Sequence, residues 1–122
     1  VVPWGYYALV GPTIGAVFKR YPIRMWERER FAKWLEEMAN KGVYTWSSIR
    51  KWTENPEKVP EGVRVQFRWA YKDDYTRPIE PDETERFKRW LEERGMSWLD
   101  YELLPESVKE MMRAEFRLSY YA

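Results

Sequence analysis

The sequence predicts an all-α protein in which an extended N-terminal arm precedes a duplicated helix-loop-helix unit that forms a small four-helix bundle. Three observations support this prediction: an uncharged N-terminal stretch broken by Pro and Gly, apolar residues at helical spacing, and an internal repeat. A chain of 122 residues is long enough for one domain with its own core. We divide it into an arm over residues 1–22 and a bundle over residues 23–122.

The arm is predicted from its composition. Residues 1–18 contain no charged side chain, but they include two prolines and three glycines. These breaks disfavour a membrane-spanning helix, which needs about 20 uninterrupted apolar residues. We therefore expect an apolar arm that lies against its own domain or against a neighbouring subunit. The candidate subunit-interface residues are Trp4, Tyr6, Tyr7, Leu9, Val10 and Phe18.

The bundle is predicted from the repeat. Residues 29–37 match residues 85–93 at seven of nine positions, and residues 56–71 match residues 105–120 at eight of sixteen. A match of this length indicates that one supersecondary unit has been duplicated.

Each repeat is predicted to contain a helix, a connection and a second helix. The first repeat covers about residues 24–72 and the second about residues 81–121. Phe, Trp and Leu recur at i, i+3 and i+4 in the first helix of each repeat, and Gly42 and Gly95 are placed to end these helices. The expected helices are 24–40, 58–72, 81–94 and 105–120.

The helix over residues 58–72 has a strand as its alternative. Residues 63–69 alternate apolar and polar side chains, which is typical of a strand. The equivalent residues 107–120 have helical spacing and follow Pro105 and Glu106, a typical helix start. We therefore predict a helix in both copies.

The tryptophans fall into two groups. Four occupy equivalent positions in the repeats and are expected in the core: Trp34, Trp90, Trp46 and Trp98. The others have no counterpart and are freer to serve an interface: Trp4, Trp26, Trp52 and Trp69.

The composition excludes most catalytic chemistry. The chain has no Cys and no His, which removes thiol and imidazole catalysis, disulfides and the usual zinc sites. Its paired carboxylates fall on polar helix faces, and it contains no phosphate-binding loop and no nucleophile elbow. We therefore expect no catalytic residue, no metal site, no cofactor and no enzyme activity.

Charge is unevenly distributed along the chain, although the net charge is only +1. Residues 1–53 carry +5 and residues 54–122 carry −4. Arginines four residues apart on a helix suit contact with successive phosphates of a nucleic acid, although they also suit pairing with nearby glutamates. The candidate nucleic-acid-binding residues are Lys19, Arg20, Arg24, Arg28, Arg30 and Lys33 at the start of the bundle, and Arg64, Arg68, Arg113 and Arg117 in the second helices.

The layout of the chain resembles the major coat proteins of filamentous and rod-shaped viruses of hyperthermophilic archaea. Abundant Glu and Arg with scarce Gln and Asn are typical of a thermophilic protein. The resemblance concerns the architecture of the whole chain: an aromatic arm, then repeats whose second halves begin at Pro56 and Glu57 and at Pro105 and Glu106.

The resemblance implies a structural nucleocapsid protein. In that family, coat subunits pair as homodimers or heterodimers and wrap linear double-stranded DNA, held in A-form, within a helical filament. The implied partners are double-stranded DNA, a second copy or a related coat chain, filament neighbours and, for the arm, envelope lipid. The implied location is the virion, with the host cytoplasm during assembly. Two alternatives remain: a small thermophilic helical protein-interaction module and a transcription regulator.

Overall fold

The computed structural model describes residues 14–120, and over this range the protein is all-helical, with eight α-helices, two short 3-10 helices and no strand. This confirms the all-α part of the predicted fold class. The elements are α2 (Ile14–Arg20), η1 (Met25–Glu27), α3 (Arg28–Asn40), α4 (Trp46–Glu54), η2 (Pro56–Lys58), α5 (Glu61–Ala70), α6 (Lys72–Thr76), α7 (Thr84–Glu93), α8 (Trp98–Glu102) and α9 (Glu106–Tyr120).

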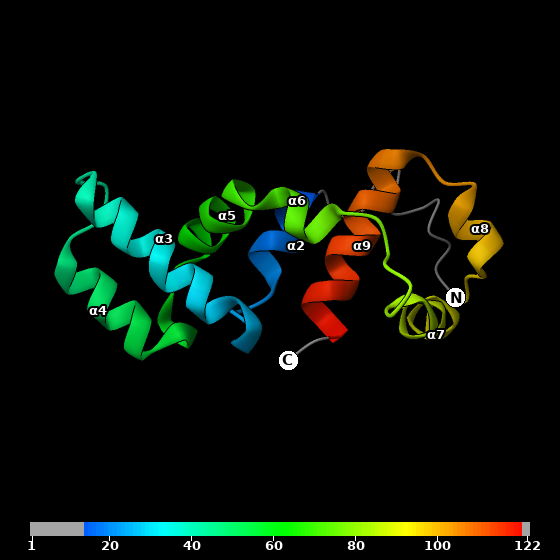
Figure 1. Ribbon diagram of the computed structural model, residues 1–122, viewed down its shortest axis with the longest axis horizontal. Helices are drawn as coiled ribbons and strands as arrows, with labels where there is room; N and C mark the ends of the chain where they lie inside the picture. Colours follow the sequence, from blue (N-terminus) through cyan, green and yellow to red (C-terminus); the bar gives the residue numbers. More distant parts are fainter. Residues whose placement is uncertain (1–13, 121–122) are drawn as a thin grey trace.

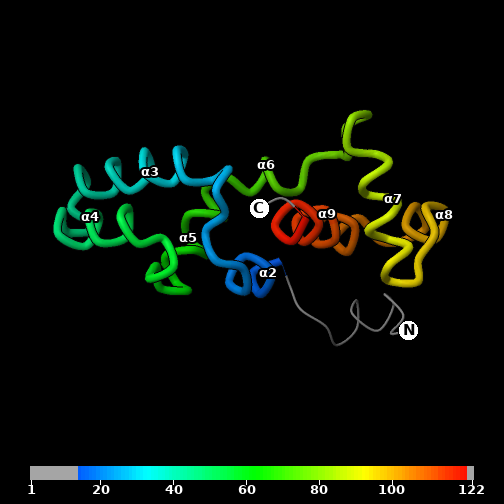
Figure 2. Tube along the Cα trace, turned by 90° about the horizontal axis from the view of Figure 1, so that it is seen from below, coloured from blue at the N-terminus to red at the C-terminus, as the bar shows by residue number. Residues whose placement is uncertain are grey.

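The molecule is elongated. Helices α3 and α4 lie at one end of its long axis and α7 and α8 at the other, with α2, α6 and α9 between them (Figure 1). A second view confirms this order of the elements (Figure 2). None of the helices among residues 14–120 combines the length and the apolar character that crossing a bilayer requires.

The duplicated unit is longer than the sequence match indicates. Helix α2 packs against α5 in the same way that α6 packs against α9, so each copy begins with a short leading helix. We call residues 14–70 the N-lobe and residues 71–120 the C-lobe. Because α2 also packs against α9, it joins the two lobes.

The predicted arm is wrong over its last part. Residues 14–20 form α2, whose Val17 and Phe18 are only 1% and 0% exposed. Phe18 packs in the core of its own chain and is therefore not available as a subunit contact. The other five predicted interface residues lie outside the described range.

The predicted connections also contain helices. Helix α4 begins after Thr45, whose side chain accepts a hydrogen bond from the Ser48 amide, and α8 begins after Ser97, which caps the Asp100 amide in the same way. Each copy therefore has a leading helix and three further helices, rather than the two helices expected.

The segment predicted as a helix over residues 58–72 is helical over Glu61–Ala70, so the helix is confirmed with narrower bounds. Its core, α5, buries Val63 and Phe67, which are four residues apart and therefore share one helical face. The buried residues recur with the period of a helix and not with the two-residue period of a strand, so the alternating pattern of this segment does not correspond to a strand.

Two glycines end the first long helix of each lobe, as predicted. Gly42 and Gly95 have φ values of 76° and 73°, in the left-handed region that side chains disfavour. After each glycine, the amide of Val43 or Met96 bonds back to the carbonyl of Met38 or Leu91, at 2.8 and 3.0 Å. These are Schellman caps, which satisfy carbonyls that the helix end leaves free.

Each lobe has its own apolar cluster. Phe31, Trp34 and Phe67 form one around α3 and α5, and equivalent residues form the other around α7 and α9. Trp34 and Trp90 are buried as expected, and Trp98 is half-buried. The expectation for Trp46 is wrong, because this side chain is 55% exposed.

Candidate nucleic-acid interface

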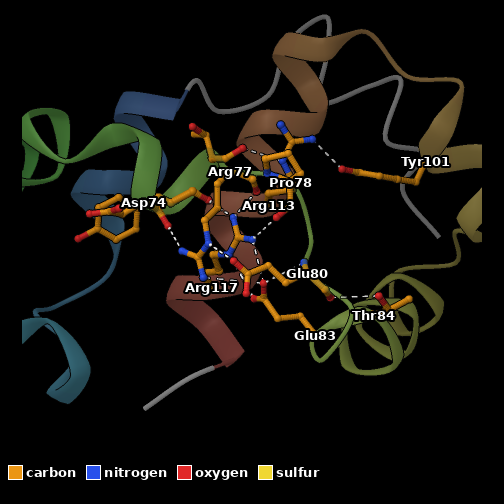
Figure 3. Close-up of polar contacts among 11 residues, drawn as sticks. Asp74, Arg77, Pro78, Glu80, Glu83, Thr84, Tyr101, Arg113 and Arg117 are labelled. Atoms are coloured by element: carbon orange, nitrogen blue, oxygen red, sulfur yellow. Dashed lines mark hydrogen bonds and ion pairs between the residues drawn. The ribbon is translucent and has the colours of Figure 1, made fainter.

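Arg117, one of the predicted phosphate contacts, lies inside the C-lobe (Figure 3). It is 3% exposed and forms a two-pronged ion pair with Glu83, with nitrogen to oxygen distances of 3.0 and 3.3 Å. Its remaining donors bond the backbone carbonyls of Tyr75, Arg77 and Pro78 at 2.8, 2.6 and 3.0 Å. The guanidinium therefore holds the end of α6 and the chain that follows it against α9.

The N-lobe repeats this arrangement. Arg68 is fully buried, pairs with Glu27 at 2.7 and 3.0 Å, and bonds the carbonyls of Phe18, Tyr21 and Pro22. Its five donors are all used, so the end of α2 is fixed against α5. We call these two constellations the arginine clamps.

A second arginine supports each clamp. In the N-lobe, Arg64 donates to the carbonyls of Val59 and Lys19. Burial and the neighbouring Arg68 charge lower the pKa of Arg64. Its guanidinium is turned toward the last turn of α2 rather than toward solvent.

Arg113 plays the same part in the C-lobe. It donates to the carbonyl of Thr76, to the hydroxyl of Tyr101 and to the carboxylate of Glu106, at 2.8, 2.9 and 2.8 Å. Burial lowers the pKa of Arg113, but the hydrogen bonds to Glu106 and Tyr101 outweigh burial and raise it overall. The hydrogen bond from Arg113 also lowers the pKa of Glu106.

The predicted stripes of phosphate contacts are therefore wrong. Arg68, Arg113 and Arg117 are buried, and Arg64 is half-buried and bonded to carbonyls. The last carbonyls of a helix carry partial negative charge and lack intrahelical donors, so they attract the same guanidinium groups that phosphates would attract. The alternative of pairing with glutamates is confirmed for Arg68, Arg113 and Arg117. Their partners are Glu27, Glu106 and Glu83, and not the expected Glu61, Glu110 and Glu115.

Glu27 and Glu83, the acidic partners in the clamps, were missed by the sequence analysis. Both follow a Pro-Ile pair by four residues, at Pro22 and Pro78, in phase with the matched segments 29–37 and 85–93. Each glutamate also accepts the backbone amide three residues earlier. Extending the repeat alignment toward the N-terminus would have revealed this shared pattern.

Arg30 is half-buried, and its guanidinium is engaged by partners within its own chain. It pairs with Asp74 at 2.9 Å and donates to the hydroxyl of Tyr75 at 2.7 Å. Its guanidinium carbon lies 4.7 Å from the centroid of the Tyr71 ring and 5.7 Å from that of Trp26. Burial and the neighbouring Glu27 charge raise the pKa of Tyr75, so the hydroxyl stays protonated and donates to Glu27. This network ties the N-lobe to α6.

Five predicted contacts stay at or near the surface. Lys19 and Arg20 are exposed at the end of α2, where they pair with Glu61 at 3.6 Å and Glu115 at 3.3 Å. Arg24 is half-buried before η1. Arg28 and Lys33 are exposed on α3 and have no ion pair with another described residue.

The charge difference between the lobes survives folding. The N-lobe has twelve Lys and Arg against seven acids, a net charge of +5, and the C-lobe has nine against thirteen, a net charge of −4. Each buried clamp neutralises one positive and one negative group within its own lobe, so the clamps change neither value. The elongated molecule therefore presents a basic half and an acidic half.

A cavity of about 420 Å³ lies where Trp26 approaches the C-lobe clamp. It is lined by Trp26, Arg77, Glu80, Asp82, Glu83, Arg86 and Arg117. Glu80, Asp82 and Glu83 each have a carboxylate oxygen within 4.8 Å of the others. Among the described residues, this is the arrangement most similar to a cation site. Burial raises the pKa of Glu83, but the hydrogen bonds from Arg117 and from the Glu80 amide, together with the charges of Arg117 and Arg77, lower it overall. Because both Glu83 oxygens already accept from Arg117, this group belongs to the clamp.

Comparisons of the chain with protein-family models, with curated proteins and with solved structures found no match. The function is therefore argued from the distribution of charged and apolar groups on the surface.

Proposed function

We propose that the protein is a structural nucleocapsid subunit that assembles into a helical filament and coats linear double-stranded DNA through sequence-independent backbone contacts. The observation that carries the proposal is the separation of charge on an elongated molecule, +5 on the N-lobe and −4 on the C-lobe. A net charge of +1 is low for a protein that coats DNA, but a subunit with separated charge can turn its basic half toward phosphates and its acidic half away from them.

The surface of the N-lobe supplies suitable donors. Arg28 and Lys33 are exposed on α3, and Lys19 and Arg20 extend the basic surface to the end of α2. Contacts of this kind neutralise phosphates and read no base sequence. In this proposal the four helices expected from the sequence, α3, α5, α7 and α9, supply the helical framework of the two lobes, and residues 1–13 contact a dimer partner or a filament neighbour.

The DNA contact is tested with charge-neutralising variants. We expect Arg28→Gln with Lys33→Gln to weaken binding equally on two unrelated linear duplexes. Because each phosphate contact contributes about 0.9 to the salt slope, the slope of log affinity against log salt should fall by about 2. Fluorescence anisotropy over a salt series measures both quantities.

The repeat offers a matched control for this experiment. Arg89 on α7 is exposed and occupies the position equivalent to Lys33. Arg89→Gln should change affinity and slope less than Lys33→Gln does, because it lies on the acidic lobe. Equal losses for the two single variants, or an unchanged slope for the double variant, would contradict the proposed DNA face.

The alternative of a protein-interaction module draws on a different observation, the exposed apolar side chains of α4 and α8. Electron microscopy of the protein with and without linear duplex DNA separates the two functions. Regular filaments that require DNA support the coat function, whereas discrete particles in both samples support the interaction module. A transcription regulator would instead discriminate strongly between the two duplexes.

A further inference from the structure

The two ends of the molecule carry exposed apolar side chains. Val43 and Trp46, where α3 turns into α4, are 54% and 55% exposed. Leu99 and Leu103, on and just after α8, are 69% and 78% exposed, and Leu103 is the most exposed large apolar residue of the described chain. Large apolar groups left in water at two defined places indicate contact surfaces.

The charges around these two apolar groups have opposite sign. Trp46 is flanked on α4 by the exposed Arg50 and Lys51, whereas Leu103 follows the exposed Asp100 and Glu102. We define the basic tip as Val43, Trp46, Arg50 and Lys51, and the acidic tip as Leu99, Asp100, Glu102 and Leu103.

The repeat makes this difference more informative. Aligning Trp46 with Trp98 places Arg50 opposite Glu102 and Lys51 opposite Leu103. Two copies of one unit thus present opposite surfaces at the same structural position, although α4 and α8 keep the same type of N-terminal cap. The side chains that differ between the two helices are exposed, so each helix can fold whichever charge it carries there. The opposite charges therefore shape the surface and are not needed for the fold.

The basic tip also contains a hollow. A cavity of about 340 Å³ is lined by Trp46, Ile49, Arg50, Thr53 and Glu54. A single leucine side chain fits within this volume, and its walls offer the ring of Trp46 and the side chain of Ile49 as apolar contacts. The exposed charged side chains of α4 beside this hollow are two cations, Arg50 and Lys51, and one acid, Glu54, so their net charge is positive. A protruding Leu103 from another molecule would fill the hollow while Glu102 approached Arg50.

The two tips cannot meet within one molecule. Helices α4 and α8 lie at opposite ends of the long axis in both views (Figures 1 and 2). A contact between two different patches on identical subunits is heterologous, and it propagates unless the rotation happens to close a ring. Charge complementarity orients such a contact and disfavours pairing of like tips.

We propose that the acidic tip of one copy of this chain docks on the basic tip of a second copy, so that subunits join head to tail. The proposal deepens the proposed function and rests on its filament-forming part, whereas DNA plays no role in the contact itself. One tip pair is small for an interface, so the contact is weak in isolation and becomes effective where subunits are held in a row.

The proposal is tested by sedimentation velocity without DNA, at low and at high salt, over chain concentrations up to about 1 mM. The wild-type chain should form dimers and longer species at low salt and fewer at high salt. Trp46→Ser and Leu103→Ser should each lower the association constant about tenfold or more, because each removes the apolar group that the contact buries. Met25→Ser is the matched control, since Met25 is 67% exposed but lies outside both tips.

Mixing the two tip variants provides the decisive arm of the experiment. The Trp46→Ser chain keeps an intact acidic tip and the Leu103→Ser chain keeps an intact basic tip, so an equimolar mixture should form dimers and stop there. A symmetric contact between like tips would instead leave one of the two variants self-associating as the wild type does. Such self-association of one variant would overturn the proposal. A mixture with no more dimer than either variant alone would also overturn it, as would a wild-type chain that stays monomeric at every concentration.

Failure of this contact is distinguishable from failure of the proposed DNA coating. Duplex binding by the tip variants is measured at dilute chain, well below the concentration of self-association. Tip variants that bind duplex with unchanged affinity but no longer self-associate separate the two properties. A wild-type chain that self-associates but binds no duplex would overturn DNA coating alone.

Discussion

At the scale of single residues, arginine is the residue whose role depends most on its neighbours. Arg68 and Arg117 have the charge and four-residue spacing of phosphate contacts, yet each saturates its donors with one glutamate and three carbonyls. Removing one partner of such a buried ion pair lowers the stability of the protein strongly, because the other charge then stays unpaired in an interior of low dielectric constant.

Breaking one clamp should therefore destabilise the protein strongly. We expect Arg117→Met to lower the free energy of unfolding by about 3–5 kcal/mol, because Glu83 would remain buried with only the more distant guanidinium of Arg77, at 3.9 Å, as a cation. Adding Glu83→Gln should recover part of this loss. Urea unfolding followed by tryptophan fluorescence measures these differences.

The exposed Arg89 provides the control for this prediction, and Arg89→Met should change stability by less than about 0.5 kcal/mol. Arg68→Met should behave like Arg117→Met, since the N-lobe clamp is built in the same way. A double variant no more stable than Arg117→Met alone would show that Glu83 does not depend on Arg117.

At the scale of the elements, local signals located the helices and their ends. Gly42 and Gly95 end α3 and α7 because a backbone turn with positive φ is required there, and this requirement depends on local chain geometry alone. The strand pattern of residues 63–69 was misleading by itself, because its two valines and its alternating apolar and polar side chains fit both elements. Its repeat partner resolved the ambiguity. Helices α4 and α8 were missed because they are short: α8 spans five residues, and the apolar residues of α4 at helical spacing, Trp46, Ile49 and Trp52, cover only two turns.

The two glycine environments in the N-lobe predict opposite effects of the same substitution. A Cβ at Gly42 or Gly62 meets no atom within 4 Å, so only backbone conformation differs between the two sites. Gly42→Ala should destabilise the protein by about 1 kcal/mol because φ is positive. Gly62→Ala should stabilise it by about 0.5 kcal/mol because the residue is helical.

Thermal unfolding of the two variants beside the wild type tests this pair. The midpoint temperature should fall for Gly42→Ala and rise for Gly62→Ala. A loss of similar size in both variants would mean that the helix cap at Gly42 contributes nothing specific.

At the scale of the whole molecule, α2 is the element that makes two lobes into one structure. Its Phe18 lies in the cluster that contains Phe87 and Phe116 of the C-lobe, and its ring packs edge-to-face against Trp69 of the N-lobe at 5.6 Å. The backbone carbonyl of Phe18 also accepts from Arg68 at 2.6 Å. A residue predicted to contact another subunit thus holds its own fold together.

Truncation of this side chain should consequently unfold rather than merely disassemble the protein. We expect Phe18→Ala to lower the free energy of unfolding by about 3–5 kcal/mol, since a fully buried aromatic ring is removed. Met25→Ala, at an exposed position, should change it by less than about 0.5 kcal/mol. If Phe18→Ala left the free energy of unfolding unchanged but altered self-association, Phe18 would be a subunit contact of the arm, as the sequence predicted.

The sequence by itself determined the helical class, the duplication, the glycine-ended helices and the Phe, Trp and Leu residues that α3 and α7 contribute to the two clusters, because each of these follows from local periodicity or backbone conformation. Only the tertiary structure decided that Arg68 and Arg117 are internal, that α2 belongs to the core and that Trp46 stands in solvent while Trp34 does not. These outcomes depend on which distant segment covers a given helix face. Residue spacing reports the face of a helix on which a side chain lies, but burial and pairing depend on what packs against that face.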